Sequence, residues 1–121
     1  MNTSALILGI VGVCGSGKST LAAQLKALGY DTRHVAQEHS FVPDMWKRIS
    51  NPDVLIFLEV SFSNTIRRKN LNWEEKDYHQ QLQRINHAFT HADLRIPTDA
   101  LTPQEILARV LTFLDENIFK K

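Results

Sequence analysis

The feature that most constrains this chain is a glycine-rich stretch between a short apolar run and a helical pattern. Residues 12–19 read Gly-Val-Cys-Gly-Ser-Gly-Lys-Ser and match G-x-x-x-x-G-K-S at every fixed position. The preceding run, Ala5–Val11, is too short for a buried helix and rich in β-branched residues, which predicts a strand covered on both faces. Leucines at helical spacing over Lys18–Leu28 predict a helix, which Gly29 is suited to end. This strand–loop–helix order predicts a phosphate-binding loop.

Each residue type in the loop has a chemistry that suits a polyphosphate. Glycines let the backbone curl so that successive N–H groups point inward, and the helix that starts near Lys18 adds its positive dipole. We expect Lys18 to reach the β- and γ-phosphates, the Ser19 hydroxyl to bind Mg²⁺ and Thr20 to lie near the α-phosphate. The candidate nucleotide-binding residues are Gly12, Cys14, Gly15, Ser16, Gly17, Lys18, Ser19 and Thr20.

Length and charge restrict the function classes. With 121 residues, the chain has room for a single domain, residues 1–121. A net charge of +1 excludes a strongly basic nucleic-acid binder as judged from bulk charge. We therefore expect a nucleoside triphosphate, and not nucleic acid, as the partner.

Cys14 is the only cysteine, which excludes an internal disulfide and fits a reducing compartment. We interpret it as a small residue that fills the loop, with a redox switch as the alternative. The apolar run 5–13 follows no cationic segment and is far shorter than the roughly 20 residues that span a bilayer. We expect a cytoplasmic protein that does not enter the membrane.

The remainder of the chain alternates between strand and helix patterns. The expected elements are a strand at Thr32–Glu38, a short helix from Pro43 through Ile49, a strand at Val54–Val60, a short helix around Ile66–Lys69, a helix that Asn72 and Glu75 start and that continues to Phe89, a strand at Ala92–Pro97, and a helix from Thr102 to Ile118. Such alternation predicts an α/β fold with a parallel sheet and helices on both faces.

With these elements in view, the chain resembles the small P-loop kinases, such as nucleoside-monophosphate, shikimate and adenylylsulfate kinases. The most specific part is Gly12–Leu21. Pro52–Ser61 followed by Arg67-Arg68 is similar to their late strand and following helix, and Ala92–Pro103 to their last strand and the turn near the adenine. The resemblance implies a three-layer α/β/α P-loop NTPase fold that binds ATP and Mg²⁺.

In these kinases, the segment between the late and last strands forms a lid whose arginines stabilise the transferred phosphoryl group. The corresponding segment here is about 62–91. By this resemblance, Arg67, Arg68 and Arg84 join Lys18 as catalytic candidates.

The chain departs from the family pattern between Glu38 and Pro52, where one strand and one helix are missing. The simplest sheet is then mainly parallel, with about four strands in the order 2-1-3-4. The missing strand normally supplies the acidic residue that assists Mg²⁺. We favour Glu38 as its replacement, because it follows a strand at the carboxyl edge, with Glu59 as the alternative. The segment Gln37–Arg48 is the candidate for substrate recognition. Within it, Glu38 or Asp44 is the candidate for the base that takes the proton of the phosphate acceptor.

Two functions follow from this pattern. The first is Mg²⁺-dependent phosphoryl transfer from ATP to a small molecule or nucleotide. The alternative is a nucleotide-binding or slowly hydrolysing switch that has no small-molecule acceptor and signals to a partner protein. An N-K-x-D motif of the kind that recognises guanine is not present, which argues against a GTPase. The resemblance implies ATP, the sequence itself does not decide between ATP and GTP, and a homodimer is possible.

Overall fold

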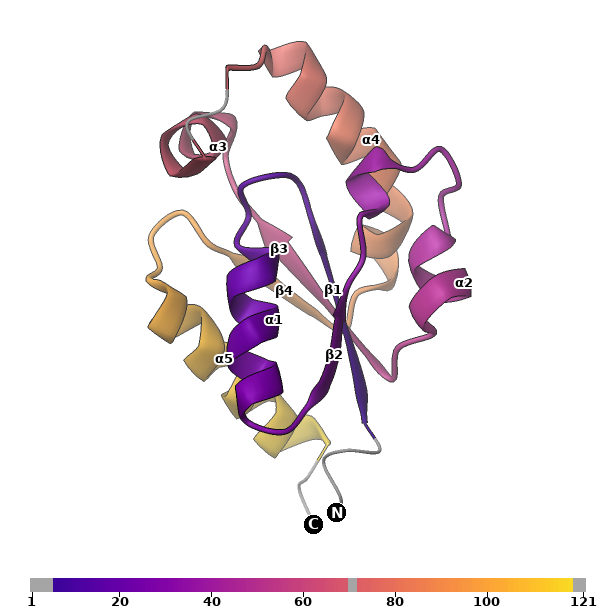
Figure 1. The fold of residues 1–121 in the computed structure, drawn as a ribbon, viewed down its shortest axis with the longest axis vertical. Coiled ribbons are helices and arrows are strands. Elements are labelled where there is room, and N and C mark those ends of the chain that lie inside the picture. Colours follow the sequence, from indigo (N-terminus) through magenta and orange to yellow (C-terminus); the bar gives the residue numbers. More distant parts are fainter. Residues whose placement is uncertain (1–5, 70–71, 119–121) are drawn as a thin grey trace.

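The computed structural model of the chain describes residues 6–69 and 72–118. At its centre lies a four-stranded sheet in the order β2-β1-β3-β4, and every neighbouring pair is parallel (Figure 1). Its strands are β1 (Ile7–Gly12), β2 (Asp31–His34), β3 (Val54–Glu59) and β4 (Leu94–Pro97). The α/β class and the strand order that the sequence predicts are confirmed. Ala5, the expected start of β1, lies outside the described residues.

Helices cover both faces of the sheet (Figure 1). They are α1 (Lys18–Ala27), α2 (Met45–Ser50), α3 (Phe62–Lys69), α4 (Glu75–His91) and α5 (Pro103–Asn117), with a 3₁₀ turn, η2, at Gln37–His39. Alternate residues of β3 explain the three layers. Ile56 and Leu58 pack with α1 and α5, whereas Leu55 and Phe57 pack with α2 and α4.

The missing strand has a direct consequence for the sheet. β2 pairs with β1 itself, in a register that runs from Ile7 opposite Asp31 to Ile10 opposite His34. Only η2 and α2 separate β2 from β3 along the chain. The residues that follow β2 therefore lie next to the loop that follows β1, because parallel strands end at the same edge.

The predicted ends of α1 and α5 are confirmed. Gly29 has a φ of 96°, and the N–H of Tyr30 donates to the carbonyl of Leu25 at 3.1 Å, which closes the C-terminal end of α1. At the start of α5, the Thr102 hydroxyl accepts from the backbone of Glu105, whose carboxylate accepts from the backbone of Thr102 in return.

Several predicted boundaries are wrong. The helix α2 begins at Met45 and not at Pro43, and β4 begins at Leu94 and not at Ala92. The expected capping box of Asn72 and Glu75 is formed two residues later by Glu74 and Asp77, so that α4 begins at Glu75. The second strand ends at His34 and not at Glu38, because the chain turns into η2. Within the described ranges, no helix combines the length and apolar character needed to cross a bilayer.

Candidate functional site

The conformation of the glycine-rich loop explains why its fixed positions are glycines. A Cβ on Gly12 would lie 2.5 Å from the Ser16 hydroxyl and 2.7 Å from the Leu58 carbonyl oxygen, so no side chain fits there. Gly17 directly precedes α1 with a φ of 99°, in the left-handed region that favours glycine. The loop thus turns tightly between β1 and α1, as the motif predicts.

Lys18 folds back across this loop. Its Nζ donates to the carbonyl oxygens of Gly12 at 2.7 Å and Val13 at 3.2 Å. It also forms an ion pair with Glu38 Oε2 at 2.8 Å, and only 10% and 5% of the two side chains are exposed. Lys18, the predicted phosphate ligand, and Glu38, the predicted Mg²⁺-binding carboxylate, are therefore in direct contact.

Gln37 holds Glu38 beside the loop. Its side-chain Nε2 donates to the carbonyls of Val42 at 2.8 Å and Arg84 at 3.2 Å, and its Oε1 accepts from the backbone of Trp46 at 2.8 Å. Gln37 is fully buried, so these bonds link η2, α2 and α4 inside the protein. The sequence shows only that Gln37 directly precedes Glu38. Its role in holding Glu38 depends on contacts with residues that are distant in sequence, such as Arg84.

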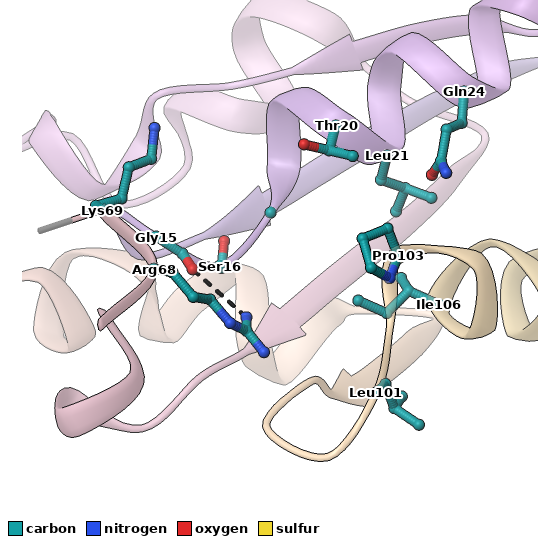
Figure 2. Close-up of a pocket in the computed structure, with 11 residues that line it drawn as sticks. Gly15, Ser16, Thr20, Leu21, Gln24, Arg68, Lys69, Leu101, Pro103 and Ile106 are labelled. Carbon is teal, nitrogen blue, oxygen red and sulfur yellow. Dashed lines mark hydrogen bonds between the residues drawn. The ribbon is translucent and has the colours of Figure 1, made fainter. Parts of the chain in front are cut away.

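Two cavities flank the loop. The one on the α1–α5 side measures about 340 Å³ and is shown in Figure 2. The predicted nucleotide residues Gly15, Ser16, Gly17 and Thr20 line it. Apolar side chains form a further part of the lining, namely Leu21, Leu101, Pro103 and Ile106, and Gln24, Arg68 and Lys69 complete it. An apolar pocket next to phosphate-type backbone donors has the character of a nucleoside site.

The second cavity, also about 340 Å³, lies on the β2 side of the loop. Ser19 and Glu38, the two predicted Mg²⁺ residues, both line it, together with His34, His39 and Lys69. Glu59 lines a different cavity, between β3 and α4. The structure thus brings Ser19 together with Glu38 and not with Glu59.

Two buried polar atoms test whether the site fits a metal and a polyphosphate. Glu38 Oε1 and Ser16 Oγ have no hydrogen-bond partner among the residues that the structure describes. A buried carboxylate oxygen without a partner suits a cation, and a buried hydroxyl in the loop suits a phosphate oxygen. The residues present therefore fit Mg²⁺ with a nucleoside triphosphate.

The candidate lid arginines occupy three different places. Arg68 lines the first cavity, and its guanidinium donates to the Gly15 carbonyl at 3.5 Å (Figure 2). It also donates to the Thr98 carbonyl at 2.7 Å and the Thr98 hydroxyl at 2.9 Å. Arg84 donates to the carbonyl of Glu38 at 3.3 Å, and its guanidinium lies 4.6 Å from the centre of the Phe41 ring. Arg67 is exposed on α3 and is not among the residues that line the two cavities.

The remaining residues of the candidate recognition segment divide between core and surface. Trp46 is buried against the sheet and donates from its indole to His87 at 3.1 Å, whereas Phe41 is 85% exposed. Asp44 lies at the start of α2, where its hydrogen bond to Arg48 lowers its pKa. Trp46 therefore serves the core, and Phe41 remains available on the surface.

Gln81 of α4 is a site residue that sequence reasoning missed. Its side-chain oxygen accepts from the backbone N–H of Cys14 at 3.0 Å, and its Nε2 donates to the Cys14 thiol at 3.4 Å. It is 6% exposed and belongs to the buried face of α4 with Ile85 and Ala88. The sequence did contain a sign of this role. Gln81 lies three positions after Tyr78 and four before Ile85, so a polar residue stands on the face of the helix that the apolar residues turn toward the core.

Hydrogen bonds at the end of β3 connect it to the neighbouring segments. The Tyr78 hydroxyl donates to the Val60 carbonyl at 2.6 Å, and burial, with the nearby charges of Asp99 and Glu59, raises the pKa of Tyr78. The Asp99 carboxylate accepts from the Ser61 backbone at 3.0 Å, and this bond is the main cause of its lowered pKa. These contacts tie α4 and the β4–α5 turn to the start of α3.

Comparisons with solved structures agree with this geometry. A shikimate kinase from Acinetobacter baumannii in complex with shikimate superposes with a TM-score of 0.67 at 14% identity, over 95% of this chain and 96% of that one. An uncharacterized protein from Eubacterium ventriosum superposes with a TM-score of 0.58 at 10% identity, over 93% and 99%. No protein-family model and no curated protein matches the sequence. The chain has the fold of the small P-loop kinases.

Proposed function

We propose that the protein binds ATP with Mg²⁺ and transfers its terminal phosphoryl group to a small molecule. The observation that supports this is the pair of cavities on opposite sides of one phosphate-type loop, each about 340 Å³. A nucleotide switch needs only the first cavity. A second cavity of the same size, lined by Lys18 and Glu38, provides room for an acceptor next to the expected γ-phosphate.

The nucleotide would lie along the loop with its nucleoside in the first cavity. The backbone donors of the loop, Lys18 and the Ser16 hydroxyl would hold the β- and γ-phosphates, and Thr20 would lie near the α-phosphate. Ser19 and Glu38 would hold Mg²⁺, which neutralises the charge that develops on the β- and γ-oxygens. GTP remains an alternative, because the turn that would contact the base leaves the choice open.

In this scheme, Glu38 and the triphosphate compete for the ammonium group of Lys18. It is paired with Glu38, and a triphosphate offers a higher negative charge than a single carboxylate. When Lys18 turns to the phosphates, the buried Glu38 loses its counter-charge and becomes available to a divalent cation. One ion pair thus connects nucleotide binding to metal binding.

The acceptor would occupy the second cavity, beside His34, His39 and Lys69. A lysine and two imidazoles favour a small molecule that carries an anionic group. The similar shikimate kinase was solved with shikimate, a small hydroxy acid of this class. The lid role of Arg67 and Arg84 is part of the same proposal, since both lie on the segment that would close over the site.

One observation favours the switch as a second candidate. The chain between β2 and β3 contains only η2 and the short helix α2, so the segment that would bind an acceptor is small. In that case, the protein would bind or slowly hydrolyse the nucleotide and signal to a partner protein.

Calorimetric titration with Mg·ATP and Mg·GTP tests the proposal. We expect saturable binding that is lost in Lys18→Ala. The double variant Lys18→Ala, Glu38→Gln is the control, because it removes Lys18 without leaving an unpaired carboxylate, and we expect it to lose binding as well. Circular dichroism verifies that each variant is folded. Unchanged binding in both variants would refute the site. If small hydroxy acids raise the rate of ADP release, the kinase function is supported. If no acceptor changes that rate, the function as a nucleotide switch is supported.

A further inference from the structure

Three side chains with metal-binding chemistry meet beside the loop. Cys14 Sγ lies 3.6 Å from His39 Nε2 and 4.0 Å from Glu38 Oε2, and the last two atoms are 3.9 Å apart. They belong to the loop after β1 and to η2, which the direct pairing of β1 with β2 brings together. A thiol, an imidazole and a carboxylate thus form one compact triangle.

The triangle has nearly the size that a tetrahedral metal requires. With a bond of about 2.3 Å to sulfur and about 2.0–2.1 Å to nitrogen and oxygen, zinc holds its ligand atoms roughly 3.4–3.6 Å apart. The separation of 3.6 Å between Cys14 and His39 lies within this range, and the other two, 4.0 and 3.9 Å, exceed it by less than about half an ångström. A rotation of the His39 side chain, which is 58% exposed, can shorten its distance to Glu38. The distance of 4.0 Å between Cys14 and Glu38 does not involve His39 and requires a small shift of one of those two side chains.

Glu38 provides an independent sign that a ligand belongs here. Its side chain is 5% exposed, and its Oε1 has no hydrogen-bond partner within the described part of the chain. Oε1 is the second oxygen of the carboxylate whose Oε2 belongs to the triangle. A buried, unpartnered carboxylate oxygen is costly, and a cation that contacts both oxygens of Glu38 relieves that cost. The second cavity, which all three residues line, leaves space for a fourth ligand such as water.

We propose that Cys14, Glu38 and His39 form a binding site for a thiophilic divalent cation of the zinc class. Thiolate and imidazole suit zinc and cobalt, whereas Mg²⁺ takes oxygen ligands. The site therefore differs from the Mg²⁺ position proposed at Ser19 and Glu38, and it does not depend on nucleotide binding. Coordination replaces the thiol S–H bond by a metal–sulfur bond and releases that proton to the buffer.

The shared carboxylate makes the proposed ion a competitor of Lys18. Glu38 Oε2 accepts from the Lys18 ammonium at 2.8 Å, so a cation that binds Glu38 displaces Lys18 or is repelled by it. Removal of that ammonium in Lys18→Ala is expected to tighten the metal site, roughly tenfold or more. The same substitution is expected to weaken nucleotide binding, so the two sites respond in opposite directions.

Cobalt(II) titration of the full chain under reducing conditions tests the site directly. Tetrahedral Co²⁺ bound to a thiolate gives a charge-transfer band in the near ultraviolet, and Cys14 is the only thiol that can produce it. We expect this band to saturate at one Co²⁺ per chain and to disappear when Zn²⁺ is added. A weak spectrum typical of octahedral oxygen ligands, or no band at all, would overturn the proposal.

Substitutions assign the ligands. Loss of an outer-sphere partner already costs about 10- to 100-fold in metal affinity, so we expect His39→Ala and Glu38→Gln to weaken Co²⁺ binding by at least about tenfold. Cys14→Ser is expected to abolish the band. His79→Ala is the matched control, because His79 is also exposed and lies 3.4 Å from a carboxylate, that of Glu75. If His79→Ala weakens binding as much as His39→Ala does, the ion binds elsewhere and the proposal fails.

Discussion

Lys18 Nζ and Glu38 Oε2 lie 2.8 Å apart, in a pair whose side chains are 10% and 5% exposed. The lysine belongs to the first turn of α1, and the glutamate to the 3₁₀ turn after β2. A buried charge tolerates the loss of its partner poorly, because the remaining group keeps its desolvation cost without the compensating attraction. The pair therefore links the stability of the fold to the residues expected to handle phosphate and metal.

The first prediction concerns this linkage. We expect Lys18→Ala to lower the free energy of unfolding by about 3 kcal/mol, because it leaves the Glu38 carboxylate buried and unpaired. Lys18→Ala combined with Glu38→Gln is expected to lose less than the sum of the single changes, by about 1–3 kcal/mol. Urea denaturation of the four proteins measures this coupling. Additive effects would mean that the two side chains do not form a pair in solution.

The second prediction separates the two roles of Glu38. Without divalent cations, we expect Glu38→Gln to bind ATP about tenfold more tightly than the unmodified protein, because Lys18 no longer leaves an ion pair to reach the phosphates. Added Mg²⁺ is expected to strengthen ATP binding in the unmodified protein and much less in the variant. Calorimetry with and without Mg²⁺ checks both. An equal Mg²⁺ effect in the two proteins would assign the metal to a different carboxylate, with Glu59→Gln as the next variant.

The third prediction concerns the start of α5. Thr102→Ala removes the hydroxyl that accepts from the Glu105 backbone and is expected to cost about 1 kcal/mol of stability. Thr112→Ala, on an exposed position within the same helix, is the control and is expected to change stability little. Comparable losses in both variants would show that the cap contributes nothing specific.

The third prediction has a second part, a pH dependence of stability that the same capping box causes. The backbone N–H of Thr102 lowers the pKa of Glu105 from its ordinary value of 4.5. A carboxyl whose pKa is lowered by folding stabilises the protein above its unfolded pKa, and this contribution is lost as the pH falls through the folded pKa. We therefore expect the stability difference between the unmodified protein and Glu105→Gln to be largest near neutral pH and to shrink below pH 4.5. A difference that stays constant with pH would contradict this origin.

The sequence predicts the architecture well because the relevant signals are local. Apolar runs mark the buried strands, Gly29 and Thr102 mark helix ends, and the absent strand leaves the order β2-β1-β3-β4 as the simplest sheet. The wrong boundaries of β2 and α4 depend on competition between neighbours. Glu74 and Asp77 form the capping box that Asn72 and Glu75 were equally able to form from the sequence alone.

The site is predicted less completely, because its partners are distant in sequence. The motif identifies Lys18, and the position after the second strand points to Glu38, but neither indicates that the two form an ion pair. The contact of Gln81 with Cys14 spans 67 positions, and only the packing of α4 determines it. The direction of Arg68 depends on Thr98 in the same way.

The fourth prediction tests Gln81 as a positioning residue for the loop. Gln81→Leu keeps a side chain of similar size but leaves the Cys14 N–H without its acceptor. We expect this loss to cost about 1 kcal/mol of stability and to weaken ATP binding severalfold. Gln81→Glu retains an acceptor oxygen for the Cys14 N–H, but it is expected to restore stability only at a pH low enough to keep the buried carboxyl neutral. Gln80→Leu, exposed on the same helix, serves as the control. Normal ATP affinity in Gln81→Leu would show that the loop keeps its shape without this contact.

The last prediction distinguishes two roles for Arg68. A lid arginine that stabilises the phosphoryl group contacts phosphate, whereas an arginine along the first cavity contacts the nucleoside. The position of its guanidinium among Thr98, Gly15 and the apolar lining favours the second role. We therefore expect Arg68→Ala to weaken ATP binding about tenfold and to leave the affinity for inorganic tripolyphosphate unchanged. Calorimetry with the two ligands measures the difference.

Arg67→Ala is the matched control for these affinities, because the lid role proposed for Arg67 concerns turnover and not affinity. Arg67 is the adjacent cation on α3 and lines neither of the two cavities. It removes the same charge from the same helix, so a general electrostatic contribution to polyphosphate binding would affect both variants and both ligands equally. A nucleoside contact affects only Arg68→Ala and only ATP. Equal losses of ATP and tripolyphosphate affinity in Arg68→Ala would instead place this arginine on the phosphates, as the resemblance to the small P-loop kinases implies.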